Sequence, residues 1–147
     1  MDFGVTIPFV SHLGFELELF EDGRSRLAYE ARPEHLNSFA VTHGGAVMTL
    51  MDVTMAAAAR SVNQEMGVVT IEMKTTFMQP ARGKLSGQGR LMHRTASMAF
   101  TQATVFDAAG RACAHSTGTF KFVKRLPIDG RTTNAPQASL PGVISTD

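Results

Sequence analysis

A chain of 147 residues with 44% hydrophobic residues is expected to fold as one domain around a core of its own. The net charge of +1 gives no argument for a nucleic-acid or membrane-surface partner, and a single cysteine excludes an intramolecular disulfide. No cationic segment precedes an apolar one at the start, and the longest apolar run, 46–59, is too short to span a bilayer. These features predict a soluble, cytoplasmic protein.

The first regular structure predicted is a β-hairpin over 15–31. Apolar residues alternate with polar ones on both sides of Asp22-Gly23, which is a typical hairpin turn. Pro33 ends the second strand, so 33–43 is expected to be a loop that begins with one short helical turn.

A helix is predicted from Gly44 or Gly45 to about Val62. Apolar residues recur there at spacings of three and four, and the opposite face is also apolar and rich in alanine. A helix that is apolar all round is a buried helix.

Beyond Gly67 the apolar period changes to two, as in a strand. Four strand-like segments separated by turn residues follow, at 68–78, 84–94, 96–107 and 111–123. In the first of them, simple alternation predicts a single apolar face formed by Val69, Ile71, Met73 and Phe77.

The order of elements is therefore two strands, one buried helix and four further strands. Short connections pair strands antiparallel, and a sheet of this size curls, so the helix is expected in its concave face. This predicts an α+β fold with five to six antiparallel strands wrapped around one long helix. The domain is expected to cover 1–125, and 126–147, with three prolines, is expected to be a mobile polar tail.

Asp52 is the only charged residue within the apolar run 46–59. A buried carboxylate costs several kcal/mol unless it is paired, hydrogen-bonded or wet, and no position within helical reach carries a basic partner. Three interpretations stay open: a structural acid bonded to distant backbone groups, a metal ligand, or a base or nucleophile that lines a cleft.

The sequence His43-Gly44-Gly45 stands where this helix begins. Free N–H groups at a helix start bind an anion or a developing oxyanion, and glycine lets a substrate carbonyl approach the backbone. Together with Asp52, two turns along, these glycines form a candidate acyl-transfer pair. Asn37 and His43, on the loop before the helix, are candidates to orient water or the carbonyl.

The stretches HLNSFAVTHGGAVMTLMDVTMAAAA (35–59) and VTIEMKTTFMQPARGKLSGQGRLMHRTASMAFTQATVFDAAGRACAHSTGTF (69–120) resemble the hotdog-fold acyl-CoA thioesterases, specifically their phenylacetate-pathway (PaaI-like) branch. The resemblance covers about 12–123. It implies a sheet wrapped around a central helix, a homodimer that pairs two sheets edge to edge, and often a dimer of dimers, or homotetramer. It also implies active sites at the dimer interface.

Carried over by position, the resemblance assigns five catalytic residues. Asp52 would be the general base or the nucleophile, the Gly44 N–H would polarise the thioester carbonyl, and Asn37 would position water or the carbonyl. His43 would support the oxyanion end, and Thr70, supplied by the opposite subunit, would lie near the attacking water.

Gly45 and Met48 are predicted to contact the substrate. The phosphates of CoA call for basic side chains at the mouth of the site, and the foremost candidates are Lys84 and Arg94. Arg94 stands where relatives often have a glycine. Further basic candidates are Arg82, His93, Lys121 and Arg125. Candidates for an apolar acyl pocket are Phe39, Met48, Met55, Phe77 and Met78.

The predicted function is hydrolysis of an aryl-acyl or medium-chain acyl-CoA to the free acid and CoA, without a metal or other cofactor. Two alternatives stay open: an acyl-thioester hydratase or dehydratase of the same fold, and a non-catalytic acyl-CoA-binding module. No nucleic-acid or membrane partner is predicted.

Overall fold

The fold is known from a computed structural model that describes residues 1–125; the predicted tail, 126–147, lies outside the described residues. The elements in chain order are α1 (Pro8–Leu13), β1 (Glu16–Glu21), β2 (Arg24–Glu30), the 3-10 turn η1 (Pro33–His35), α2 (Gly44–Arg60), β3 (Met66–Phe77), β4 (Lys84–Arg94), β5 (Met98–Phe106) and β6 (Ala112–Lys124).

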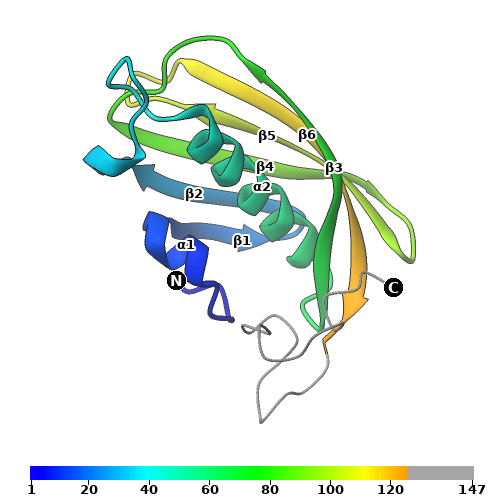
Figure 1. The fold of residues 1–147 in the computed structure, drawn as a ribbon. Coiled ribbons are helices and arrows are strands. Elements are labelled where there is room, and N and C mark those ends of the chain that lie inside the picture. The colour runs from blue at the N-terminus through cyan, green and yellow to red at the C-terminus, as the bar shows by residue number, and fades with distance from the viewer. Residues whose placement is uncertain (126–147) are drawn as a thin grey trace.

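All six strands form one antiparallel sheet in the order β1-β2-β4-β5-β6-β3. The sheet curls around α2, which lies in its concave face (Figure 1). Leu50, Met51, Met55 and Ala58 of α2 are fully buried against this face. The predicted α+β fold with an enclosed helix is confirmed.

The predicted turns are also confirmed. Asp22 and Gly23 adopt positive φ angles of 50° and 78°, as a tight hairpin requires. At the turn between the predicted strands 96–107 and 111–123, the Asp107 carboxylate accepts hydrogen bonds from the backbone N–H groups of Ala109 and Arg111, each at 3.0 Å. The short helical turn after Pro33 is η1.

Helix α1 was not predicted, because six residues are too few to show a helical period. Its limits nevertheless follow ordinary rules. Pro8 occupies the first turn, and Gly14, with φ of 79°, ends the helix in the left-handed conformation. Val10 and Leu13 are buried in the core.

The predicted apolar face of β3 is wrong because a β-bulge interrupts the strand. The register with β6 shifts between Thr70 and Glu72, so one extra residue reverses the alternation. Val68 and Met73 pack against the core, whereas Ile71 is 48% exposed. The bulge therefore leaves Thr70 on the face that meets α2.

Glycines in β4 let α2 approach the sheet closely. A Cβ at Gly87 would lie 2.7 Å from Thr54 Oγ1, and one at Gly89 would lie 2.5 Å from Ser25 Oγ and 2.9 Å from the Thr54 carbonyl oxygen. The Ser25 hydroxyl donates to that same carbonyl at 2.6 Å. The absence of side chains at Gly87 and Gly89 thus fixes the depth at which α2 lies.

Gly89→Ala is expected to destabilise the fold by about 1–3 kcal/mol, because the added methyl group overlaps α2 backbone and the Ser25 hydroxyl. Chemical denaturation would measure the free energy of unfolding. Gly83→Ala tests strain alone, since Gly83 has φ of 65° but a Cβ there would contact nothing within 4 Å. A Gly89 variant as stable as the wild type would contradict this packing account.

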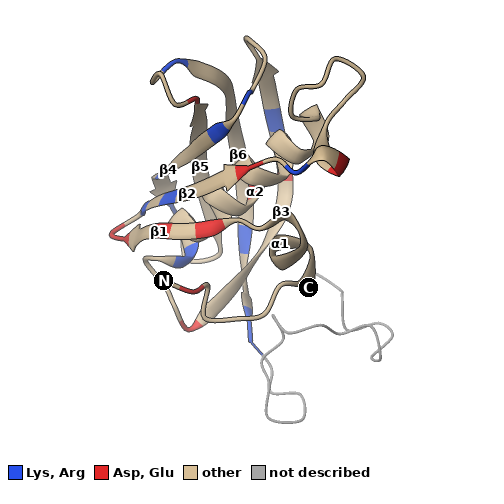
Figure 2. Cartoon of the chain, turned by 90° about the vertical axis from the view of Figure 1, so that its left-hand side faces the viewer, with Lys and Arg blue, Asp and Glu red and all other residues tan. Residues whose placement is uncertain are grey.

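None of the helices within residues 1–125 is both long enough and apolar enough to cross a membrane. Figure 2 shows acidic and basic residues interspersed over strands and turns rather than gathered by sign.

Candidate active site

The start of α2 carries a backbone donor that the described residues leave free. His43 is the N-cap residue, and its ring Nδ1 accepts a hydrogen bond from the Gly45 N–H at 2.9 Å. The N–H groups of Ala46 and Val47 both donate to the His43 carbonyl oxygen. Within residues 1–125 the Gly44 N–H has no hydrogen-bond partner. Gly44 therefore keeps the predicted anion-binding donor, whereas the Gly45 N–H is already used by His43.

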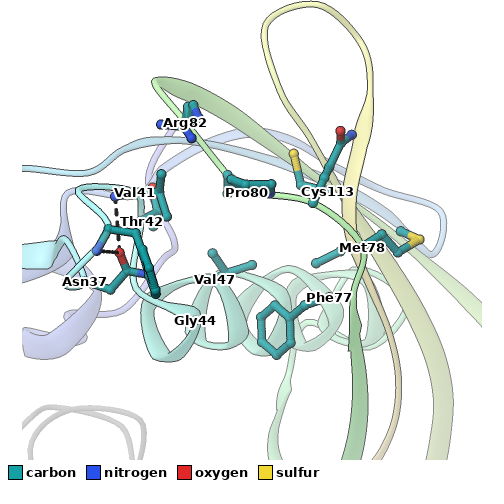
Figure 3. Close-up of a pocket in the computed structure, with 14 residues that line it drawn as sticks. Asn37, Val41, Thr42, Gly44, Val47, Phe77, Met78, Pro80, Arg82 and Cys113 are labelled. Atoms are coloured by element: carbon teal, nitrogen blue, oxygen red, sulfur yellow. Dashed lines mark hydrogen bonds between the residues drawn. The ribbon is translucent and has the colours of Figure 1, made fainter.

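Gly44 faces a largely apolar cavity of about 550 Å³, here called the Gly44 cavity. Figure 3 shows Gly44 at the start of α2, Val47 and Phe77 beside it, and Arg82 across the opening. The full lining is Asn37, Phe39, Val41, Thr42, Gly44, Val47, Phe77, Met78, Gln79, Pro80, Ala81, Arg82, Cys113 and Ala114.

Asn37 holds the loop that leads into α2. Its side-chain Oδ1 accepts hydrogen bonds from the N–H groups of Phe39, at 2.9 Å, and Val41, at 3.3 Å (Figure 3). The amide NH2 makes no hydrogen bond within the described part of the chain, and the residue lines the Gly44 cavity. Asn37 is thus a loop cap whose remaining donor group is available to a ligand.

Asp52 has one hydrogen-bond partner among residues 1–125, the hydroxyl of Thr70, which donates to its Oδ1 at 2.7 Å. Burial raises the pKa of Asp52, and the Thr70 hydrogen bond partly opposes that rise. No backbone N–H of the described chain binds this carboxylate, so it is not the backbone-bonded structural acid considered above. Thr70 and Asp52 of one chain are therefore in contact, and the expectation that Thr70 acts from the opposite subunit stays a prediction.

Asp52 lines a second, smaller cavity of about 210 Å³, here called the Asp52 cavity. The N-terminal segment 3–10 lies over α2 there and closes one side. The lining is Phe3, Val5, Ile7, Val10, Asp52, Val53, Ala56, Ala57, Arg60, Val68, Thr70 and Phe120.

A single chain does not bring the acid and the backbone donor to one place. Gly44 and Asp52 are eight residues apart on α2, a rise of about 12 Å. The two cavities share no lining residue. One thioester carbonyl cannot meet both groups of the same chain.

The predicted basic residues are dispersed. Lys84 and Arg94 lie at opposite ends of β4, about 33 Å apart along the strand, and neither lines the Gly44 or Asp52 cavity. The Arg94 guanidinium lies over the Phe122 ring, 4.5 Å from its centroid. Arg82 is the basic residue that lines the Gly44 cavity. Contacts of Lys84 and Arg94 with CoA stay predictions.

Three of the five residues predicted for an acyl pocket, Phe39, Phe77 and Met78, line the Gly44 cavity. Met55 is fully buried in the core. Met48 is 37% exposed on the flank of α2 that the sheet does not cover, one turn before Asp52.

The N-terminal wall of the Asp52 cavity and Arg60 were not predicted. Their contacts join residues more than forty positions apart, such as Phe3 and Arg60, and a single sequence carries no signal for such contacts. Cys113 is buried, and burial raises the pKa of its thiol, as is typical of an unreactive cysteine.

Comparison with solved structures supports the fold. The chain is similar to a conserved protein from Pseudomonas aeruginosa, with a TM-score of 0.77 and 25% identity over 82% of this chain and 97% of that one. It is also similar to the PaaI protein of the E. coli phenylacetic acid degradation operon, with a TM-score of 0.73 and 18% identity over 78% and 83% of the two chains.

The sequence comparisons supply the family. A relative from Saccharolobus solfataricus that is named as an esterase is 28% identical over 112 residues, which are 76% of this chain and 79% of the relative. The family model of the Thioesterase superfamily matches residues 39–114, the segment that runs from the loop before α2 into β6. The chain therefore belongs to the Thioesterase superfamily, with the hotdog fold, and is a thioester hydrolase.

Proposed function

We propose that the protein hydrolyses acyl-CoA thioesters to a free acid and CoA, at a site shared by two copies of the chain. The observation that carries this proposal is the separation of Gly44 from Asp52 along one helix. If two α2 helices lie antiparallel across a two-fold axis, Gly44 of one copy comes beside Asp52 of the other. Each dimer then holds two equivalent sites.

The surface around β3 supports such a dimer. β3 is an edge strand that pairs only with β6 within the described sheet. Ile71, Phe77 and Met78, on or next to this strand, are each about half exposed. Met48, on the neighbouring flank of α2, is 37% exposed. An open edge flanked by large apolar side chains is typical of an interface.

The chemistry follows from the two groups. The Gly44 N–H, with the positive end of the α2 dipole behind it, would polarise the thioester carbonyl and stabilise the oxyanion. The Asn37 amide would add a second donor, while His43 holds the helix start through Gly45. Asp52, oriented by Thr70, would activate water or attack the carbonyl carbon itself.

Both routes give the same products. Water supplies the oxygen of the new acid, the carbon–sulfur bond breaks, and a proton passes to the departing CoA sulfur. The acid must be ionised to act, and the raised pKa of Asp52 makes its carboxylate a stronger base than that of an exposed aspartate.

The apolar linings suit an aryl-acyl or medium-chain acyl group, and Arg82 is placed to face a phosphate of CoA. In the dimer we place the acyl group in the Asp52 cavity and the thiol arm of CoA in the partner's Gly44 cavity. Gly45 and Met48 would border the reacting carbonyl.

Release of free thiol from a panel of acyl-CoAs tests this function. Wild-type protein is expected to hydrolyse phenylacetyl-CoA or medium-chain acyl-CoAs with saturation kinetics. Binding of these thioesters without release of thiol would overturn hydrolysis and favour a binding module. Addition of water across an enoyl-CoA double bond would favour the hydratase alternative.

A further inference from the structure

Arg60, at the end of α2, is a buried cation. Arg60 is only 8% exposed. Its Nη2 donates a hydrogen bond to the Phe3 carbonyl oxygen at 3.1 Å, and its guanidinium carbon lies 5.7 Å from the centre of the Phe20 ring. Its Nε is buried and has no hydrogen-bond partner in the described part of the chain. Some of its donor capacity is therefore unused inside the protein.

A second guanidinium lies close to the first. Arg125, directly after β6, has buried Nε and Nη2 atoms that find no hydrogen-bond partner among residues 1–125. Burial and the nearby charge of Arg125 lower the pKa of Arg60 to about 10. Two like charges with unused buried donors form an unfavourable arrangement unless an anion compensates them.

No carboxylate within residues 1–125 supplies that compensation. The ion pairs of the described chain join Arg26 to Glu18, Arg32 to Glu34 and Arg111 to Asp107, and none includes Arg60 or Arg125. Within residues 1–125 this pair of arginines therefore has no complementary anion.

The position of Arg60 indicates what carries the anion. Arg60 and Asp52 line the same cavity, eight residues and about 12 Å apart along α2. The wall between them is apolar and includes Val53, Ala56 and Phe120. The cavity therefore presents a reactive end, an apolar middle and a cationic end.

We propose that the Asp52 cavity takes an acyl group that ends in a carboxylate, whose apolar chain lies along α2 and whose carboxylate binds Arg60, with the charge of Arg125 adding to the attraction. This inference rests on the proposed thioester hydrolysis. A cavity of about 150 Å³ holds a benzene ring, so 210 Å³ suits a dicarboxylic acyl chain of about six carbons. The substrate class is the half-thioester of a short dicarboxylic acid with CoA.

Adipoyl-CoA and hexanoyl-CoA make a matched pair, since both have six acyl carbons and only the first has a distal carboxylate. Wild-type protein is expected to show a kcat/KM about tenfold or more higher for adipoyl-CoA, as a charged hydrogen-bonded pair would give. Arg60→Gln is expected to lose this preference, because KM for adipoyl-CoA rises towards that for hexanoyl-CoA. Arg26→Gln, an exposed arginine on β2 that lies outside both cavities, is the control and should keep the preference.

Melting temperatures show whether the variants fold. If Arg60→Gln does not fold, Arg60→Lys and Arg125→Gln should each reduce the preference for adipoyl-CoA. A preference for hexanoyl-CoA in the wild type, or a preference for adipoyl-CoA that survives all three substitutions, would overturn the proposal and leave thioester hydrolysis standing.

Calorimetric binding of adipoyl-CoA separates the carboxylate site from the hydrolysis. If adipoyl-CoA binds in a way that depends on Arg60 but no thiol is released, hydrolysis is wrong and the carboxylate site stands. If free adipate or inorganic phosphate stabilises the wild type but not Arg60→Gln, and no acyl preference exists, the site takes a free anion and the substrate assignment is wrong.

Discussion

Asp52→Asn is expected to lower kcat for acyl-CoA hydrolysis by about 10²–10⁴-fold, the usual contribution of a positioned base. Asparagine has the same shape and still accepts a hydrogen bond from Thr70, but it can neither remove a proton nor attack the carbonyl. Thiol release by wild type and variant, side by side on one acyl-CoA, measures the effect. Turnover within tenfold of the wild type would rule out Asp52 as base or nucleophile.

The pH dependence provides an independent check on the same residue. Burial raises the pKa of Asp52 above its ordinary value of 3.8, and ionised Asp52 is the active form, so wild-type activity should fall at low pH along a limb that lies above 3.8. A raised acid pKa also means that ionisation of Asp52 destabilises the folded state as the pH rises above 3.8. Asp52→Asn should therefore melt at the same temperature as the wild type below pH 3.8, and at an equal or higher temperature at pH 7. A variant that melts far below the wild type at neutral pH would show that the carboxylate is structural.

Gly44→Pro is expected to lower kcat by about 10²–10³-fold, as loss of an oxyanion donor does. The substitution removes the free N–H and keeps the helix start, because proline is favoured at the first position of a helix. His43, with φ of −59° and ψ of 137°, is already in the extended conformation that a following proline requires. Gly44→Ala is the matched control, since its Cβ would meet the Phe77 ring at an ordinary 3.4 Å and its N–H remains. Equal loss in both variants would implicate the added side chain instead of the lost donor.

Mixing the two inactive variants tests whether the site is shared. If Asp52 and Gly44 of different copies form one site, a mixed dimer of Asp52→Asn and Gly44→Pro contains one intact site and one that lacks both groups. Random reassortment of subunits then restores about one quarter of wild-type activity. No recovery after confirmed exchange of subunits would show that both groups act from the same chain.

Much of the fold can be read from local patterns. The hairpin around Asp22-Gly23, the helix from Gly44 and the later strands each follow from periodicity and turn residues within a short window. The predictions from sequence fail where the apolar pattern is too short or is interrupted by a bulge. Helix α1 is too short to show a period, and the bulge in β3 reverses an alternation that the sequence displays without a break.

In the candidate site, too, the sequence reveals some features and not others. Asp52 is conspicuous in the sequence because a carboxylate in an apolar helix needs a compensating partner, and Gly44 because it opens that helix. That His43 uses the Gly45 N–H and leaves only that of Gly44 is a matter of ring geometry, which no spacing rule gives.

By itself, the sequence determined the fold class, the enclosed helix and the two groups of the candidate site, Asp52 and Gly44, since these depend on residue type and local spacing. Only the tertiary structure decided which residues surround those groups. It placed Thr70 on Asp52 within one chain, separated Asp52 and Gly44 into two cavities, and brought Phe3 and Arg60 together to close one of them. These contacts join segments that are far apart in the chain, and their geometry depends on how deeply α2 lies in the curled sheet.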